Sequence, residues 1–254
     1  MRRWVLLWAL TGLTLTSPLA AQDAIGPIEP DRPDFTEGTG IIPAGHYQVE
    51  GGATFARVEE NETTSLGEVL VRIPLAEWLE ARLGVGSYSW SHGGGPDFEG
   101  YEDPEVGVKV HLADSSGGFP DVALLFLTTV PVGARDFTAD AWQPTVKLAV
   151  GWDLTPRFSL SSNLNASYLA EGDDRFSQIA ASLSAGFSMT ERLGAFLEAF
   201  GFSEETADGP GTAYVNGGFA YAVSDDLSLD IRAGAGLNDA SPDYFLGAGA
   251  SVRW

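Results

Sequence analysis

The chain ends on the stretch Tyr244-Phe-Leu-Gly-Ala-Gly-Ala-Ser-Val-Arg-Trp254, in which apolar residues recur at every second position. Alternate residues of a β-strand point to opposite faces, so this spacing predicts a strand with one apolar face. The opposite face carries Phe245, Ser251 and Arg253 with two glycines. A final exposed tryptophan is unusual for a soluble β-sandwich, whereas aromatic residues gather at the membrane interface of a transmembrane barrel.

Residues 227–237 repeat this alternation more sharply. One face is wholly apolar, and its members are Leu227, Leu229, Ile231, Ala233, Ala235 and Leu237. The other face carries Ser228, Asp230 and Arg232 with two glycines. In a soluble sandwich the apolar face would form a core, whereas in a transmembrane barrel it would contact lipid and the polar face would line the lumen.

The N-terminus has the features of a secretory signal peptide. Two arginines precede an apolar run over residues 4–15, and Pro18 precedes a cleavage site expected after Ala21. A membrane anchor is the alternative, but an anchor needs ~20 apolar residues and this run is shorter. We therefore expect residues 1–21 to be cleaved.

Composition excludes several classes of protein. The chain has no cysteine, so neither a lipoprotein attachment site nor a disulfide framework is possible. Its formal net charge of -21 argues against a nucleic-acid partner. Glycine, at 31 of 254 residues, and an aromatic content of 11% favour a β protein. Beyond residue 21 no uncharged apolar segment is long enough for a spanning helix.

The mature chain divides into a lead-in and a barrel. Residues 22–43, which we call the lead-in, contain four prolines, and proline lacks the amide donor that a strand ladder needs. Residues 44–254 predict about twelve alternating strands of roughly ten residues each, an even number and a length that suit a tilted strand crossing a bilayer. The expected strands lie near 46–58, 67–73, 79–86, 105–112, 121–130, 145–152, 158–168, 178–187, 193–199, 215–223, 227–237 and 244–254.

The connections between these strands alternate between tight turns and longer polar loops. The longer loops are expected at residues 59–65, 91–100 (rich in glycine), 131–141, 171–174, 203–211 and 238–243. In outer-membrane barrels the short turns face the periplasm and the longer loops face outward. Aromatic residues cluster at the tight-turn end, namely Trp78, Trp152, Phe158, Phe187, Tyr221 and Trp254. The sequence therefore predicts an all-β antiparallel transmembrane β-barrel in the outer membrane of a Gram-negative bacterium.

Several motifs also resemble a known family. They are Asp31-Arg-Pro-Asp-Phe-Thr-Glu-Gly38, Gly45-His-Tyr-Gln-Val-Glu-Gly-Gly52, Val130-Pro-Val-Gly133 and Asp226-Leu-Ser-Leu-Asp-Ile-Arg-Ala-Gly-Ala-Gly-Leu-Asn238. They resemble the bacterial outer-membrane family named for the MetA pathway of phenol degradation, over nearly all of the mature chain. The resemblance implies a transporter-like barrel for small organic molecules, aromatic or hydrophobic ones among them, and it implies no catalytic residues.

Charged residues recur on the polar faces of the strands and are expected to line the lumen. Six are acidic and six are basic: Glu50, Glu68, Glu80, Glu105, Glu198 and Asp230, and Arg72, Arg82, Lys109, Lys147, Arg232 and Arg253. Buried charges must be paired, so one interpretation is a structural barrel with a closed lumen braced by ion pairs. The other is a narrow polar path or substrate site gated by the same residues, and both can hold together.

An outer-membrane lipid hydrolase is the rival class of function. The histidines are His46, His92 and His111, and no Gly-x-Ser-x-Gly elbow accompanies them. Three scattered histidines without cysteine offer no metal-ligand spacing. We therefore expect a protein that is not an enzyme and that needs neither a metal nor a cofactor.

The predicted outer loops are strongly acidic. They contain fifteen aspartates and glutamates and one arginine, Arg135. Such loops could bind divalent cations that bridge to lipopolysaccharide, although acidic loops that only keep the surface solvated are the alternative. The other expected partners are outer-membrane lipid, a small-molecule substrate and the barrel-assembly machinery.

The lead-in combines charge with stiffness, which suggests that it partly plugs the lumen. Its distinctive residues are Asp31, Arg32, Asp34 and Phe35, and the basic wall residues expected to pair with its acids are Arg82, Lys109 and Arg232. A twelve-stranded barrel leaves internal space for such a segment. A periplasmic tail without contacts is the alternative. The predicted function is an outer-membrane channel or transporter whose lead-in restricts passage.

Trp254 is expected to act as an assembly signal, because it ends the strand that must pair with the first strand and be recognised in the periplasm. Deleting Trp254 should lower the yield of heat-modifiable, membrane-inserted protein. A truncated chain that inserts at the normal level would show that this role of the last strand is misassigned.

Overall fold

The computed structural model describes residues 26–94 and 96–254, so the predicted signal peptide lies outside the described residues. The described chain consists of strands joined by turns and loops. In chain order the strands are β1 (Gln48–Val58), β2 (Asn61–Ala76), β3 (Leu79–Val85), β4 (Tyr88–His92), β5 (Phe98–Tyr101), β6 (Glu105–Ala113), β7 (Asp121–Thr129), β8 (Gln143–Thr155), β9 (Phe158–Glu171), β10 (Asp174–Ser188), β11 (Leu193–Phe202), β12 (Thr212–Ser224), β13 (Leu227–Gly236) and β14 (Tyr244–Arg253).

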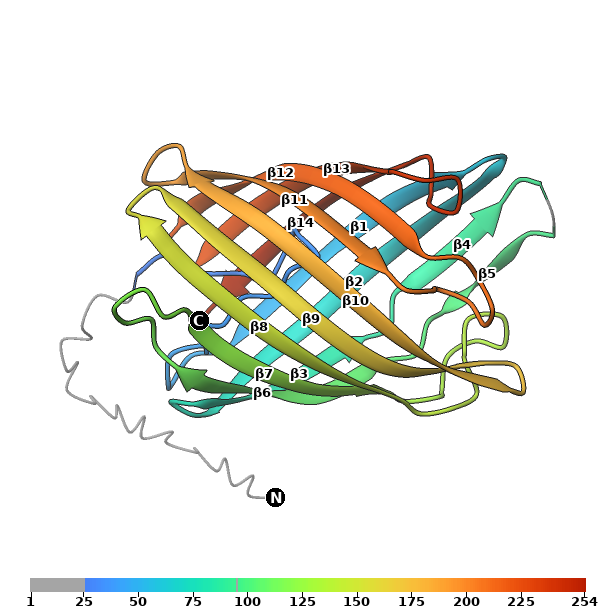
Figure 1. The fold of residues 1–254 in the computed structure, drawn as a ribbon, viewed down its shortest axis with the longest axis horizontal. Coiled ribbons are helices and arrows are strands. Elements are labelled where there is room, and N and C mark those ends of the chain that lie inside the picture. The colour runs from blue at the N-terminus through green and yellow to red at the C-terminus, as the bar shows by residue number, and fades with distance from the viewer. Residues whose placement is uncertain (1–25, 95) are drawn as a thin grey trace, which may run out of the picture.

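These strands form one antiparallel sheet that closes into a barrel, because β1 pairs with β14 on one side and with β2 on the other (Figure 1). β3 and β4 follow each other along β2, and they pair in turn with β6 and β5. β3 and β4 therefore form one interrupted strand of the wall, and β5 and β6 form the next. The predicted barrel of twelve antiparallel strands is confirmed.

Two segments expected to be loops belong to the wall instead. The expected outer loop at residues 59–65 is mostly strand, because β2 begins at Asn61 and a tight turn with Glu59 at a φ of 54° joins it to β1. The expected glycine-rich loop at residues 91–100 contains parts of β4 and β5, which pair as a hairpin. Both segments lack aliphatic residues, so the alternation that marks the other strands is missing although backbone pairing continues.

Outward-facing side chains of the wall are mainly apolar, and inward-facing ones are mainly polar. On β9, Leu164 is 53% exposed whereas its neighbour Asn163 is 2% exposed. β7 is apolar on both faces, and it turns Leu125 inward and Phe126 outward. A soluble sandwich would bury its apolar face, so this arrangement excludes that alternative.

Among the described residues, none belongs to a helix with the length and apolar character needed to cross a membrane.

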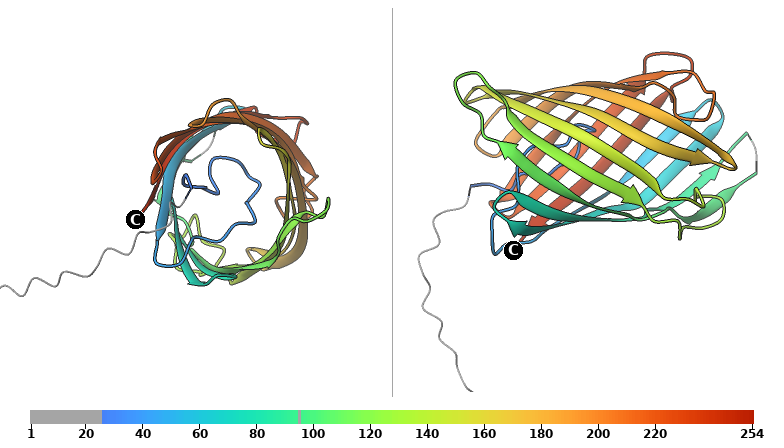
Figure 2. Two further views of the ribbon diagram at one scale, coloured as in Figure 1. Left: turned by 90° about the vertical axis from the view of Figure 1, so that its left-hand side faces the viewer. Right: turned by 60° about the horizontal axis from the view of Figure 1, so that its bottom comes forward.

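The described part of the lead-in, residues 26–43, runs inside the barrel. Figure 2 shows it in blue within the ring of strands, where it enters from the end that also holds the C-terminus. Two hydrogen bonds fix its entry. The amide of Ile28 donates to the carbonyl of Asp225 at 2.7 Å, and the guanidinium of Arg253 donates to the carbonyl of Gly26 at 2.8 Å.

Candidate functional site in the barrel lumen

Asp31 of the lead-in is the centre of an ion-pair network. Its carboxylate lies 2.6 Å from a guanidinium nitrogen of Arg82 and 2.9 Å from Nζ of Lys109, with Arg72 at 3.5 Å. Arg72 on β2 and Arg82 on β3 are direct partners in the strand register. Like charges directly opposite each other destabilise a sheet, so the shared carboxylate offsets their repulsion.

Wall carboxylates hold the main chain of the lead-in. Glu50 accepts hydrogen bonds from the amides of Asp31 and Arg32, at 3.1 and 3.0 Å. Three further amides are held in this way: Phe35 and Thr36 donate to Glu198 at 2.9 and 2.7 Å, and Ile42 donates to Glu80 at 3.0 Å. These carboxylates satisfy backbone donors that a strand ladder would otherwise satisfy.

Arg32 of the lead-in forms ion pairs with acidic residues of the wall. Its guanidinium lies 2.6 Å from Glu68 and 3.4 Å from Asp230. Gly52 on β1 and Gly249 on β14 pair directly in the register, and a Cβ atom at either position would collide with the Arg32 guanidinium. The two glycines therefore leave the space that the lead-in fills.

Thr36 and Glu37 connect the lead-in to a further group of strands. Glu37 forms ion pairs with Lys147 of β8 and, at 3.0 Å, with Arg82. The amide of Glu37 donates to Oδ1 of Asn163 on β9 at 2.7 Å. The hydroxyl of Thr36 lies 2.7 Å from that of Ser182 on β10. The lead-in is thus attached to strands around the barrel.

The ten residues predicted to line the lumen all occupy inward-facing positions. Seven are at most 5% exposed, namely Glu50, Arg72, Glu80, Arg82, Lys109, Glu198 and Asp230, and the half-buried ones are Glu105, Lys147 and Arg232. Among the described residues, the ion pairs formed within the wall of the lumen are Arg72–Glu50, Arg72–Glu80 and Arg82–Glu80. The other ion pairs of these ten residues include a residue of the lead-in.

Arg232 does not have the partner expected from the sequence. It was expected to pair with an acid of the lead-in, but it donates to the carbonyl of Pro33 at 2.8 Å and to the hydroxyl of Thr54 at 2.9 Å. The lead-in passes Arg232 with its main chain, so a backbone carbonyl and not a carboxylate accepts the hydrogen bond.

Several residues that hold the lead-in were not recognised in the sequence as site residues. They are Thr36, Gly52, Asn163, Ser182 and Gly249. Glycine weakens the interior of a strand, and it often marks a site where another segment approaches closely. The facing glycines on adjacent strands were therefore a signal that a segment lies against the wall there. The neutral polar residues carried no such signal, since they are typical of any barrel lumen.

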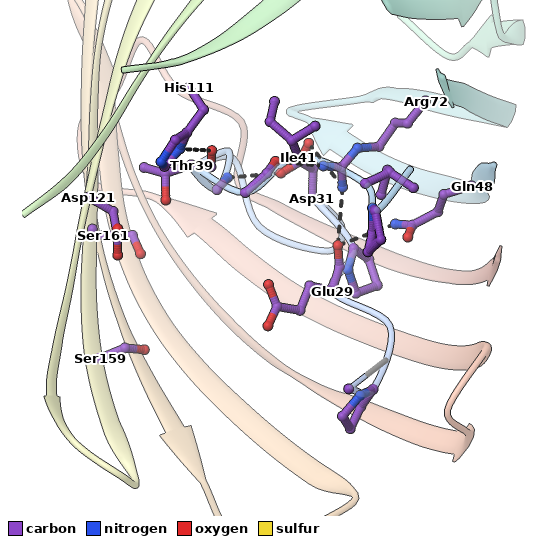
Figure 3. A pocket seen from close by; sticks show the side chains of 18 of the residues that line it. Glu29, Asp31, Thr39, Ile41, Gln48, Arg72, His111, Asp121, Ser159 and Ser161 are labelled. Carbon is purple, nitrogen blue, oxygen red and sulfur yellow. Dashed lines mark hydrogen bonds and ion pairs between the residues drawn. The ribbon is translucent and has the colours of Figure 1, made fainter. Parts of the chain in front are cut away.

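A cavity of about 760 Å³ lies between the lead-in and the wall at the end where the lead-in enters. Figure 3 shows Glu29, Asp31, Thr39 and Ile41 of the lead-in facing it, with Gln48 and Arg72 on one side. Ser159, Ser161, His111 and Asp121 line the cavity from the other strands. The lining is mainly polar, as a path for water-soluble molecules requires.

Three residues near this cavity could hold a metal ion. His111, Asp114 and Asp121 each place one ligand atom within 4.8 Å of the others. A ring nitrogen of His111 lies 2.9 Å from Asp114, and the other lies 3.3 Å from the carbonyl of Thr39. These contacts already engage both ring nitrogens, and the Asp114 side chain is 95% exposed, so the cluster is accounted for by the contacts of His111 with Asp114 and with the lead-in.

The lead-in carboxyl groups differ in their ionisation. Burial alone would raise the pKa of Asp31, but the three surrounding cations hold it well below its ordinary value. Against the effect of burial, Lys147 helps to lower the pKa of Glu37 to about 2. Burial and the charge of Glu198 raise the pKa of Asp34 to about 8. At neutral pH, Asp31 and Glu37 are therefore ionised, whereas Asp34 is mainly protonated.

Comparison with known families decides the relationship that the sequence motifs suggested. Residues 30–254 match the family described as "Putative MetA-pathway of phenol degradation". The chain belongs to this family. Comparison with curated protein sequences gave no match.

Solved structures with a similar fold are outer-membrane proteins. An outer membrane channel from Pseudomonas putida F1 aligns with a TM-score of 0.72 and 12% identity, over 85% of this chain and 98% of that chain. The NanC porin aligns with a TM-score of 0.56 and 12% identity, over 81% of this chain and 98% of that chain. The KdgM porin, in complex with disordered oligogalacturonate, aligns with a TM-score of 0.52 and 9% identity, over 82% of this chain and 98% of that chain. The closed barrel and its likeness to these outer-membrane proteins place this chain in the outer membrane of a Gram-negative bacterium.

Exchanging Asp31 for asparagine should release the lead-in, because the amide leaves Lys109 without its ion-pair partner and removes one of the counter-charges of Arg72 and Arg82. The chain has no cysteine, so a single Thr36→Cys substitution, at a position that is 3% exposed, reports release through maleimide labelling. Breaking a buried ion pair costs about 3–5 kcal/mol, so Asp31→Asn should raise the labelling rate roughly a hundredfold or more.

The matched control is Glu62→Gln, which removes one charge from an ion pair with Arg57 whose side chains are 35% and 42% exposed. Exposed pairs contribute little, so this variant should leave the labelling rate of the Thr36→Cys protein unchanged. Equal labelling rates with and without Asp31→Asn would contradict the central role of this carboxylate.

Proposed function

We propose that this protein is an outer-membrane channel for small organic molecules and that the lead-in restricts passage until it moves away from the wall. The observation that carries the proposal is the path of the lead-in through the lumen. Its anchors lie on strands that include β2, β3, β11 and β13, so the segment obstructs a solute that moves along the barrel axis.

The kind of contact favours an obstruction that can be removed. Apart from the main-chain bond of Ile28, residues 26–43 are held by ion pairs and by hydrogen bonds that involve side chains, and these residues form no strand ladder with the wall. Water can replace such contacts one at a time, and the cavity beside the lead-in gives water access to them. A segment added to a sheet would exchange less readily, because its ladder breaks cooperatively.

The comparisons support the class of function. The description of the family names phenol degradation, and the names of similar structures are those of a channel and two porins. We extend to this chain only a broad class of cargo, small organic molecules that include aromatic or hydrophobic ones. The polar lumen and the closed wall support passage through the barrel rather than around it.

A structural barrel with a closed lumen is the second candidate, and the buried pairs of Arg72 and Arg82 with Glu80 favour it. A lipid hydrolase has less support. In the part of the chain that the structure describes, none of the three histidines hydrogen-bonds a serine, and His111 is engaged by Asp114 and Thr39. We therefore propose no enzymatic activity.

The partners follow from the surface of the barrel. We propose that the acidic outer loops bind divalent cations shared with lipopolysaccharide, and that Trp254 is read by the barrel-assembly machinery. Trp254 is 60% exposed, and its main chain pairs with Tyr47 at 2.9 and 3.1 Å, next to the closure of β1 and β14.

Deleting residues 22–40 while keeping the signal peptide should raise the single-channel conductance, because the segment that crosses the lumen is gone. Planar-bilayer recordings on refolded, heat-modifiable protein give the measurement. Deletion of residues 22–25 alone is the matched control, since every contact described for the lead-in remains, and its conductance should equal that of the full mature chain.

The deletion removes Asp31, the ion-pair partner of Lys109, which is fully buried in the intact barrel, and the unpaired charge could prevent folding. Adding Lys109→Met to the deletion removes that buried charge and keeps the experiment decisive. If the folded deletion conducts no better than the full chain, the lead-in does not restrict passage and the closed structural barrel is favoured.

A further inference from the structure

Aromatic rings meet inside the lumen near the loop that joins β11 to β12. Four of them belong to the wall and one to the lead-in: Phe200 and Phe202 of β11, Tyr214 of β12, Phe245 of β14, and Phe35. The inward-facing residues on the strands beside them are polar, Ser182 and Asn216 for example. A water-filled path does not need this apolar row.

The rings form a slot for one planar group. Phe35 stacks on Phe200 with ring centroids 4.6 Å apart and an interplanar angle of 12°. Phe200 stacks in turn on Tyr214, its cross-strand partner, at 4.7 Å and 10°. Phe202 stands edge-on to Phe35 and to Phe200, at 77° and 89°. Phe200 therefore provides the floor of the slot and Phe202 its side.

The wall side of the slot is fixed independently of the lead-in. Tyr214 and Phe245 are 5% and 8% exposed, and the hydroxyl of Tyr214 donates to the carboxylate of Glu205. Phe245 lies over Gly234, where a Cβ atom would collide with its ring. Both rings stand on paired strands of the wall, β12 and β14, and not on the lead-in.

Phe35, by contrast, comes from residues 26–43, which form no strand ladder with the wall. The amides of Phe35 and Thr36 are already held by Glu198, so the main chain has an anchor that is separate from the ring. The stack adds a contact that an outside ring of the same shape can reproduce. A small aromatic molecule can therefore replace the ring of Phe35 in this stack.

We infer that Phe200 and Phe202 form a binding site for an uncharged planar aromatic molecule, and that such a molecule displaces Phe35. The inference rests on the proposed function in one respect, since the molecule reaches the slot through the lumen. A ligand that binds only when Phe35 has left stabilises the released state of the lead-in. An aromatic solute would thereby promote its own passage.

The ligand class follows from the occupant. Phe35 presents a six-membered ring without a polar group, and both partners present a face or an edge that favours a flat π-system. A saturated ring of similar size buries a similar apolar area but loses the stacked geometry. Benzamide and cyclohexanecarboxamide differ in this respect and carry the same neutral amide, so they make a matched pair of probes.

The test uses the full mature chain with Thr36→Cys as the only cysteine, folded in liposomes. Benzamide should raise the rate of maleimide labelling in a saturable manner by about fivefold, the change that one aromatic pair supports, whereas cyclohexanecarboxamide should not. No acceleration by benzamide, or equal acceleration by both probes, would overturn the inference.

Two variants separate a binding site from simple packing. Phe200→Leu should abolish the dependence of labelling on benzamide, even if its basal rate rises because the stack is lost. Phe35→Leu removes the internal competitor and should lower the benzamide concentration that gives half-saturation. A benzamide response that persists in Phe200→Leu, or an unchanged half-saturation in Phe35→Leu, would contradict the slot.

The outcomes for the site and for the channel can be told apart. Labelling measures release of the lead-in without any solute flux, whereas conductance of the deletion variant measures obstruction. If deletion raises the conductance but benzamide does not change labelling, the proposed channel function stands and the proposed aromatic site is wrong. If benzamide selectively accelerates labelling but deletion leaves the conductance unchanged, the proposed aromatic site stands and the proposal that the lead-in restricts passage is wrong.

Discussion

Three buried cations share the carboxylate of Asp31, and the interior of the barrel depends on this contact. Arg72 and Arg82 face each other across two strands, and Lys109, on the next strand, is fully buried with Asp31 as its ion-pair partner. Breaking a buried ion pair and leaving one charge unpaired costs about 3–5 kcal/mol. The wall and the lead-in are therefore complementary parts of one folded unit.

Much of this structure could be predicted from periodicity. Alternation of apolar and polar residues located the strands and their facing, as for Leu164 and Asn163, because the bilayer imposes opposite polarity on the two sides of the wall. The path of the lead-in could not be derived in this way. Arg232 binds the carbonyl of Pro33 instead of an acid, since pairing inside the lumen depends on how an irregular segment turns, and local sequence does not determine that.

The lumen has two chemically distinct parts that meet at the lead-in. From Asp31 to Glu37 the segment binds fixed charges of the wall, and at Phe35 it binds a row of rings. The charged contacts give the segment one defined position, because ion pairs at several strands specify its register. The aromatic contact adds a place where a solute can compete. Restriction and response to cargo would then reside in the same short segment, while the barrel itself stays rigid.

The most direct test of a movable lead-in is to lock it reversibly. The hydroxyl oxygens of Thr36 and Ser182 lie 2.7 Å apart, so a cysteine at each position should form a disulfide in a chain that has no other cysteine. We expect the oxidised Thr36→Cys/Ser182→Cys protein to conduct less than its reduced form, and each single-cysteine control to be insensitive to reductant. Identical conductance before and after reduction of a demonstrated disulfide would contradict the claim that passage requires the lead-in to move.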